Sequence, residues 1–102
     1  MGLGNLAKMA KQMQAEMARV QAELEILTLE GTAGGGAVKA IVTGKQEVVS
    51  VTIDPSVVDP TDVEMLQDLV TAAVNDALRS ARDTAEQKLA AVTGGMTIPG
   101  LG

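Results

Sequence analysis

Residues 1–27, MGLGNLAKMAKQMQAEMARVQAELEIL, hold an uninterrupted heptad pattern. Apolar residues recur at alternating steps of three and four, which is the spacing of one helical face. A seam of this length predicts a long helix that packs against a partner, and taken alone it favours a parallel two-stranded coiled coil. The seam consists of Leu3, Leu6, Ala10, Met13, Met17, Val20, Leu24 and Leu27.

The side of this helix opposite the seam carries basic residues. A turn of about 100° per residue places Lys8, Lys11 and Arg19 there, among alanine and polar side chains. The helix therefore offers an assembly face and a cationic face.

The first helix is expected to run from Gly4 or Asn5 to Ile26, with Asn5 as its N-cap. Short β-branched segments separated by glycines follow it. Three consecutive glycines also occur in phosphate-binding loops, but those loops lead from a strand into a helix. Because strands flank this run, we expect a hairpin in an antiparallel three-stranded meander. The strands are expected at 28–32, 37–43 and 47–53, joined at residues 34–36 and at 44–45.

A second long helix is expected after Asp54-Pro55. Asp59 is the expected N-cap, Pro60 the first helical residue and Asp62 a favourable charge in the first turn. An apolar stripe rich in alanine continues to Thr93, which indicates close approach of a neighbouring backbone. Gly94-Gly95 should end the helix in a left-handed cap.

The composition excludes several classes of function. The 102 residues include no cysteine and no histidine, which removes thiolate and Ser-His-Asp nucleophiles and the usual zinc sites. We expect no enzymatic activity, no cofactor and no small-molecule substrate. The N-terminus lacks the apolar region of a signal peptide, and no apolar run approaches about 18 residues, so we expect a soluble cytoplasmic protein without membrane contact.

The chain is also expected to be one domain, residues 1–102, with a flexible tail from about residue 95. A chain this short buries only roughly 60 to 70% of its unfolded surface, so a second subunit is expected to supply the missing burial. Phe, Tyr and Trp are all absent, which leaves the core to aliphatic side chains and methionine.

Charge is unevenly distributed along the chain. The net charge is −5, but residues 1–22 carry +2, residues 23–76 carry −8 and residues 77–102 carry +1. Both ends are therefore basic and the middle is acidic. An acidic total argues against a nucleic-acid ligand, whereas the basic ends provide the local positive potential that phosphate binding needs.

Two other groups of residues are expected to be structural. Carboxylates close in sequence could suggest a magnesium site, but they are explained as turn, cap and solvated helix residues; they are Asp54, Asp59, Asp62, Glu64 and Asp68. A stripe of methionines on the first helix is expected to be core or interface rather than a metal or haem site, since histidine and cysteine are absent; it consists of Met9, Met13 and Met17.

Four strings spread over the chain resemble the YbaB/EbfC family of bacterial nucleoid-associated proteins. They are GLGNLAKMAKQMQ (2–14), VTIDPSVV (51–58), EMLQDLVTAAVNDAL (64–78) and GGMTIPG (94–100). The resemblance implies an α+β fold of order α-β-β-β-α and an intertwined homodimer with projecting helices. It also implies binding to duplex DNA in the nucleoid, with an indirect effect on transcription. Much of the heptad seam would then pack within that dimer or its core, through Leu6, Met13, Met17, Val20, Leu24 and Leu27.

If duplex DNA is the ligand, bases near both chain ends are the candidates: Lys8, Lys11, Arg19, Arg79, Arg82 and Lys88. They could equally be solvated helix charges, some paired at i, i+4 with Glu23 or Glu86. Lys39 and Lys45 lie in the acidic middle and are weaker candidates.

The mode of binding can be narrowed by the missing residue types. Without aromatic rings to stack bases, we expect contact with duplex phosphates and weak sequence preference. Six first-helix bases in a dimer would give a slope of log K against log salt of roughly −5. The net negative charge keeps a second class of function open. In this alternative the protein is an interaction adaptor for a replication, recombination or repair factor, and its contact with DNA is incidental.

Overall fold

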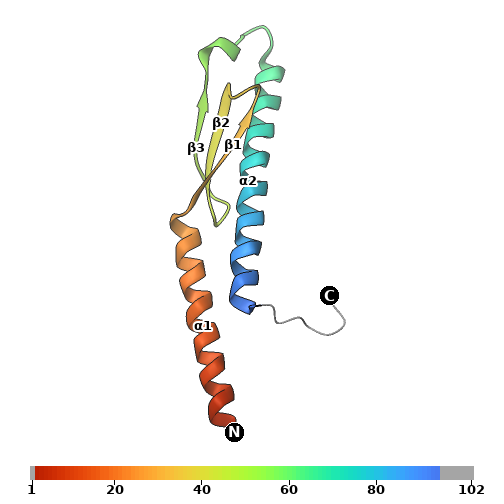
Figure 1. Ribbon diagram of the computed structural model, residues 1–102. Helices are drawn as coiled ribbons and strands as arrows, with labels where there is room; N and C mark the ends of the chain where they lie inside the picture. The colour runs from red at the N-terminus through yellow and green to blue at the C-terminus, as the bar shows by residue number, and fades with distance from the viewer. Residues whose placement is uncertain (1, 95–102) are drawn as a thin grey trace, which may run out of the picture.

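The computed structural model describes residues 2–94, and two long helices set its shape (Figure 1). The molecule measures 71 × 29 × 16 Å, with a radius of gyration of 19.6 Å against about 13 Å for a compact chain of this length. The predicted order α-β-β-β-α is confirmed. Its elements are α1 (Leu3–Ile26), β1 (Thr28–Ala33), β2 (Val38–Thr43), β3 (Val48–Ile53), the 3-10 turn η1 (Pro55–Val57) and α2 (Val63–Thr93). The predicted tail from residue 95 lies outside the described residues.

The three strands form an antiparallel meander in the order β1-β2-β3. Ala33 pairs with Val38, so the three glycines lie in the hairpin loop between them. Their φ angles of +63°, +67° and +94° are in the region that side chains disfavour, which explains why glycine occupies all three positions. The loop is therefore a hairpin, as its flanking strands indicated.

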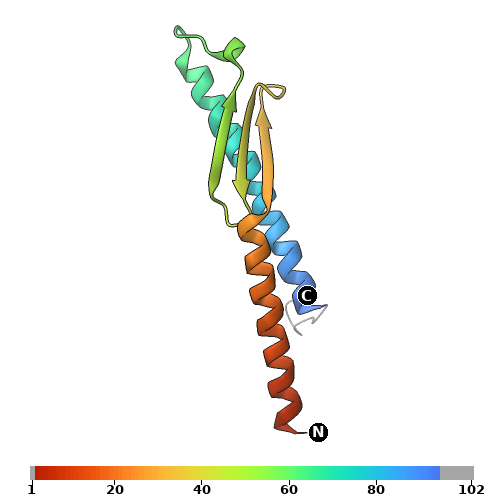
Figure 2. The ribbon, with the colours of Figure 1, turned by 90° about the vertical axis from the view of Figure 1, so that its left-hand side faces the viewer.

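α2 lies across β1 and β2 and makes the core with them (Figure 2). Alanines at every fourth position of α2 face the sheet, and the fully buried side chains are Val38, Ala40, Val42, Ala73, Ala77 and Ala81. Gly31 of β1 lies where a β-carbon would be 2.2 Å from the Ala77 nitrogen and 2.3 Å from the Ala73 oxygen. Small residues on both sides therefore let the helix and strand backbones approach closely.

β3 is left largely uncovered, because α2 contacts it much less than it contacts the other strands. Val51 pairs with Ala40 and Val48 with Val42, so both valines belong to the face of the sheet on which α2 lies. Val48 is nevertheless 50% exposed and Val51 38% exposed. An apolar strip thus remains beside α2 on the helix side of the sheet.

The turn between β2 and β3 seats the C-terminal end of α1. The Gly44 amide donates to the Leu27 carbonyl at 2.9 Å, and a β-carbon at Gly44 would be 2.7 Å from the Leu24 carbonyl oxygen. Leu24 and Val20 are buried at this junction. The absence of a side chain at Gly44 therefore sets how closely α1 meets the sheet.

Both helices begin at residues other than the predicted ones. α1 begins at Leu3 with Gly2 as its N-cap and no side-chain cap, so the prediction of Asn5 is wrong; the Asn5 amide donates to the Gly2 carbonyl within the first turn. The N-cap of α2 is Asp62, which accepts from the Met65 amide at 3.2 Å, so the prediction of Asp59 is also wrong.

The Asp59 side chain instead accepts from the amide and hydroxyl of Thr61. It closes a local turn, which aspartate favours as readily as a cap. At the other end of α2, Gly94 has φ 58° and ψ 41°, so the left-handed cap is confirmed.

Candidate nucleic-acid interface

The N-terminal part of α1 extends past the end of α2 (Figure 1). Val92, close to the end of α2, lies beside Met9 and Met13, and the helix before this contact projects alone. We call residues 3–12 of α1 the arm; its first turns project alone, and its last turn lies beside Val92. Lys8 and Lys11 are exposed on it, and within the described part of the chain no carboxylate forms an ion pair with either. The arm therefore presents two free ammonium groups to solvent.

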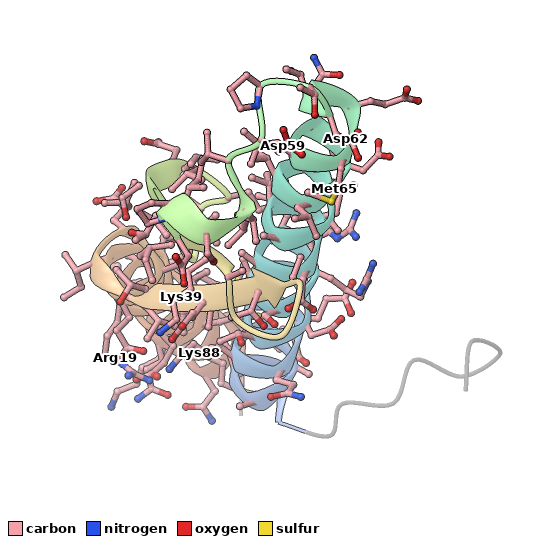
Figure 3. The ribbon with its side chains drawn as sticks, turned by 90° about the horizontal axis from the view of Figure 1, so that it is seen from above. Arg19, Lys39, Asp59, Asp62, Met65 and Lys88 are labelled. Atoms are coloured by element: carbon pink, nitrogen blue, oxygen red, sulfur yellow. The ribbon has the colours of Figure 1, made fainter. Side chains whose placement is uncertain are left out.

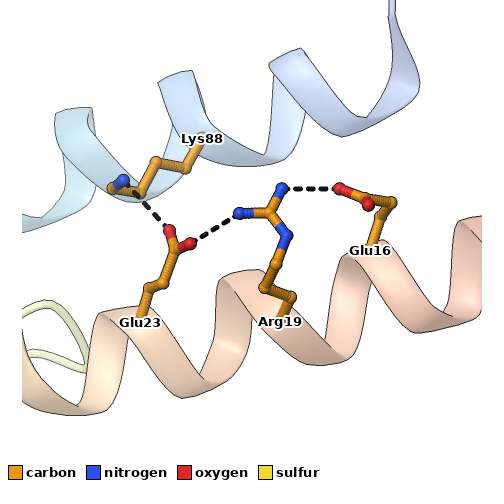
Figure 4. A network of polar contacts seen from close by, with 4 residues as sticks. All are labelled: Glu16, Arg19, Glu23 and Lys88. Carbon is orange, nitrogen blue, oxygen red and sulfur yellow. Dashed lines mark hydrogen bonds and ion pairs between the residues drawn. The ribbon is translucent and has the colours of Figure 1, made fainter.

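Two other predicted bases lie together in a chain of ion pairs between α1 and α2 (Figure 4). Arg19 donates to Glu16 at 2.5 Å and to Glu23 at 2.6 Å, and Lys88 donates to the other oxygen of Glu23 at 3.2 Å. We call these four residues the ionic chain. The pair of Arg19 with Glu23 predicted from sequence is confirmed.

The ionic chain changes the acid–base properties of its members. The hydrogen bond from Lys88 lowers the pKa of the Glu23 carboxyl, and the charges of Lys88 and Arg19 lower it further. The hydrogen bond and charge of Glu16 raise the pKa of Arg19, with Glu23 adding to the effect. Both shifts favour the charged forms of Arg19 and Glu23, and the chain contains two basic and two acidic side chains.

The arginines of α2 lie on another face of that helix. At about 100° per residue, Arg79 and Arg82 fall on the side opposite the buried alanine stripe, away from the ionic chain. Arg79 lies 3.8 Å from Asp76. Arg82 has no ion-pair partner among the described residues, so the predicted pair with Glu86 is absent. The six candidate bases are thus divided among the arm, the ionic chain and the outer face of α2.

The two weaker candidates are engaged beside the sheet. Lys39 lies 3.5 Å from Glu30 on the neighbouring strand. Lys45, in the turn that seats α1, donates to the Gln21 side chain. These contacts assign both lysines a local structural role.

The end of the molecule opposite the arm is acidic. Residues 46–78 contain seven acidic residues and no base. Three of these carboxylates close turns or cap a helix: Asp54 accepts from the Ser56 amide, Asp59 from Thr61 and Asp62 from Met65. Figure 3 shows Asp59, Asp62 and Met65 together at the start of α2. No group of three or more acidic side chains among the described residues is arranged to hold a metal ion.

The heptad seam is divided between core and surface. Val20 and Leu24 are buried where α1 meets α2 and the sheet, whereas Leu6 is 64% exposed and Met13 and Met17 are each 36% exposed. The apolar side of α1 is therefore covered near its C-terminal end and open along the arm. Among the described helices, none has the length and apolarity to cross a membrane.

The sequence profile of the YbaB/EbfC DNA-binding family matches residues 1–96. The chain belongs to this family. A nucleoid-associated protein of Pelotomaculum thermopropionicum is 52% identical over 101 residues, covering 96% of each chain. A nucleoid-associated protein of Moorella thermoacetica is 52% identical over 103 residues, covering 98% of this chain and 99% of its own.

The fold is shared with a solved structure at low sequence identity. It is the uncharacterized protein HP0035 from Helicobacter pylori, which superposes with a TM-score of 0.78 at 22% identity over 92% of this chain and 99% of the other. The YbaB/EbfC family is a DNA-binding family and not a family of enzymes.

The sequence did not indicate two contacts that position the candidate basic residues. These are the ion pair of Glu23 with Lys88 and the contact of Gly44 with the C-terminal end of α1. Both join residues far apart along the chain, which leaves no local signal.

Proposed function

We propose that this protein is a homodimer that binds duplex DNA mainly through backbone phosphates, with weak sequence preference. In this way it organises the bacterial nucleoid, in the cytoplasm, and modulates transcription. Membership of a DNA-binding family supports the ligand, and the names of the relatives support the location. The observation that carries the proposal is the projecting arm, on which Lys8 and Lys11 are exposed and free of carboxylate partners among the described residues.

The distribution of charge along the molecule supports binding at the arm end. The described segment 46–78 lies mainly at the opposite end, carries seven carboxylates and would repel phosphate. A polyanion approaching the protein is thus steered toward the arm. We assign the principal phosphate contacts to Lys8 and Lys11, with Arg82 as a further contact. Arg19, Arg79 and Lys88 are secondary because each is paired with a carboxylate.

The absence of Phe, Tyr and Trp supports phosphate contact over base stacking. In a dimer, the two arm lysines of each protomer would make four phosphate contacts. At about −0.9 per contact, these alone give a slope of log K against log salt of roughly −3.6. This is shallower than the slope of about −5 expected when Arg19 is counted as free.

Uncovered apolar surface supports the homodimer. The strip on β3 formed by Val48 and Val51 continues the surface on which α2 lies, and a second copy of α2 would cover it in the same manner. The open seam of α1 supplies a second apolar surface, formed by Leu6, Met13 and Met17. Two copies would thereby bury surface that one chain leaves exposed, which contributes stability in proportion to its area.

Light scattering of a matched pair of variants tests the dimer. Val51→Asp places a charge on the exposed strip and should give a monomer. Ser50→Asp places the same charge on the opposite face of the same strand and should remain dimeric. A wild-type monomer, or dimers of both variants, would contradict this assignment.

Titration of duplex DNA at several salt concentrations tests the ligand. Lys8→Gln/Lys11→Gln should weaken binding at low salt and make the salt slope shallower by about 3.6 per dimer. The matched control Lys39→Gln/Lys45→Gln removes equal charge from bases with local partners and should keep most of the wild-type slope. Failure of wild type to bind at low salt refutes the proposed ligand. Equal slopes of the two variants refute the assignment to the arm.

The acidic end favours one second candidate, an adaptor for a replication, recombination or repair factor. Its seven carboxylates between residues 46 and 78 have no base among them and could receive a basic partner. Under this alternative, DNA contact is incidental, and the arm variant would leave the protein's cellular role unchanged. Loss of that role together with DNA binding would favour the first proposal.

A further inference from the structure

Glu23 holds two cations at once. Its Oε1 accepts from Arg19 Nη1 at 2.6 Å, and its Oε2 accepts from Lys88 Nζ at 3.2 Å. One carboxylate thus binds a guanidinium and an ammonium through separate oxygens, as a DNA phosphate could (Figure 4). The two cations come from residues that are 69 positions apart in sequence and meet only through the fold.

We propose that Glu23 is an internal substitute for phosphate, which withholds Lys88 from DNA and so limits the affinity of the site described above. This inference rests on the proposed function. It makes Glu23 a residue that restrains binding, and it predicts that DNA affinity is set below what the protein's basic residues could provide.

The exposure of Glu23 and Lys88 allows DNA phosphate to compete with the Glu23 carboxylate for Lys88. The Lys88 side chain is 36% exposed and the Glu23 side chain is 37% exposed, so both charges remain within reach of solvent and of a ligand. To contact a DNA phosphate, Lys88 must first separate from Glu23. The Glu23 carboxylate, no longer paired with Lys88, then repels the phosphate that has taken its place. Lys88 therefore gains little by the exchange, although an unpaired lysine at the same place would bind phosphate.

Removal of Glu23 should release one cation in each protomer. Arg19 keeps its contact with Glu16 at 2.5 Å, so Glu23→Gln leaves Arg19 paired and frees Lys88 alone. A dimer would gain two phosphate contacts, which steepen the slope of log K against log salt by about 1.8. Between 50 and 200 mM salt, the variant should lose about 12-fold more affinity than wild type.

The matched control is Glu25→Gln. Glu25 lies two residues further along α1 and forms no ion pair among the described residues. Its removal changes the net charge equally but frees no base. Glu25→Gln should therefore keep the wild-type slope. If both variants steepen the slope equally, general electrostatics explains the effect and the inference is overturned.

The double variant Glu23→Gln/Lys88→Gln separates competition from a loosened helix. Both Glu23→Gln and the double variant break the link between α1 and α2, but only the single variant supplies a free ammonium. The steeper slope should therefore disappear in the double variant. If it persists, movement of α1 causes it and the inference is overturned.

Two outcomes separate this inference from the proposed function. If wild type fails to bind duplex DNA, the proposed function is refuted; binding by Glu23→Gln but not Glu25→Gln would then support the inference, and binding by neither would overturn it. A measurement without DNA adds an independent check. Carboxyl NMR should show the pKa of Glu23 rising in Lys88→Gln, because that hydrogen bond is the main cause of its lowered value. An unchanged pKa would overturn the inference whatever the DNA result.

Discussion

Replacing Gly31 by alanine should disrupt the core more than any change of one methyl group elsewhere in the sheet. The new β-carbon would lie 2.2 Å from the Ala77 nitrogen and 2.3 Å from the Ala73 oxygen, whereas ordinary contact begins at 3.4 Å. Those neighbours are backbone atoms of α2, which cannot rotate away as a side chain can. To restore ordinary contact, β1 and α2 must therefore separate by about an ångström where Gly31 faces Ala73 and Ala77.

The size of this effect follows from the cost of overpacking. Extra methylenes in a packed core typically cost about 1–3 kcal/mol of stability. Because the new methyl group would meet backbone atoms of α2, which cannot move aside, we expect Gly31→Ala to cost about 3 kcal/mol or more. For a domain of this size, 1 kcal/mol corresponds to about 4–8 °C in Tm. We expect Tm to fall by at least about 12 °C.

Thermal unfolding followed by far-ultraviolet circular dichroism measures the effect, because the chain has no aromatic fluorophore. The matched control is Gly4→Ala, where a β-carbon would meet nothing within 4 Å on an exposed turn of α1. That change should raise stability by less than the roughly 0.5–1 kcal/mol that alanine gains over glycine inside a helix, because Gly4 is the second residue of α1. Proteins must be compared at equal concentration, since the Tm of a dimer depends on it. A Gly31→Ala protein that melts within about 4 °C of wild type would refute the close-approach argument.

Three further changes test other parts of the structure. Gly44→Ala would put a β-carbon 2.7–2.9 Å from atoms of α1, so it should cost about 1–3 kcal/mol and, by tilting the arm, weaken DNA binding; Tm and a DNA titration measure the two effects. Asp62→Ala removes the N-cap of α2 and should lower stability by about 1 kcal/mol, whereas Asp59→Ala removes only a turn contact and should cost less; a larger loss for Asp59→Ala would contradict the observed cap. The pKa values of Glu23, Asp54 and Asp59 lie below their ordinary values of 4.5, 3.8 and 3.8 because of hydrogen bonds from Lys88, Ser56 and Thr61, respectively. The three ionised carboxylates should contribute their full stability at pH values above the ordinary pKa values, and this contribution should be lost as the pH falls through the lowered pKa values. Tm measured against pH should therefore fall in that acidic range. The fall should be less steep in Asp54→Asn/Asp59→Asn, which lacks two of the carboxylates.

Local sequence patterns were sufficient to predict the secondary structure but not every helix boundary. The heptad of residues 1–27, the glycine-rich hairpin and the alanine stripe of the second helix each led to the observed element. The N-cap of α2 was predicted wrongly because Asp59 and Asp62 have the same chemistry three residues apart, and either could close a turn or cap a helix. Only the conformation of the intervening chain distinguishes them.

The candidate site was less accessible from sequence. Lys8 and Lys11 are exposed as expected, but every described residue before Val20 is exposed as well. The i, i+4 spacing predicted the pair of Arg19 with Glu23, but the second contact of Arg19, with Glu16, was not predicted. The pairing of Lys88 with Glu23 spans 65 residues, and no local pattern could indicate it.

The sequence by itself determined the order of helices and strands, the absence of aromatic and thiol chemistry, and the concentration of bases near the chain ends. These properties depend on residue type and on spacing within a few turns of the chain. The tertiary structure decided which bases remain free, that β3 stays largely uncovered and how closely α1 meets the sheet. Those properties depend on contacts between distant residues, above all at Gly31, Gly44 and Glu23, where the shape and charge of one element meet those of another.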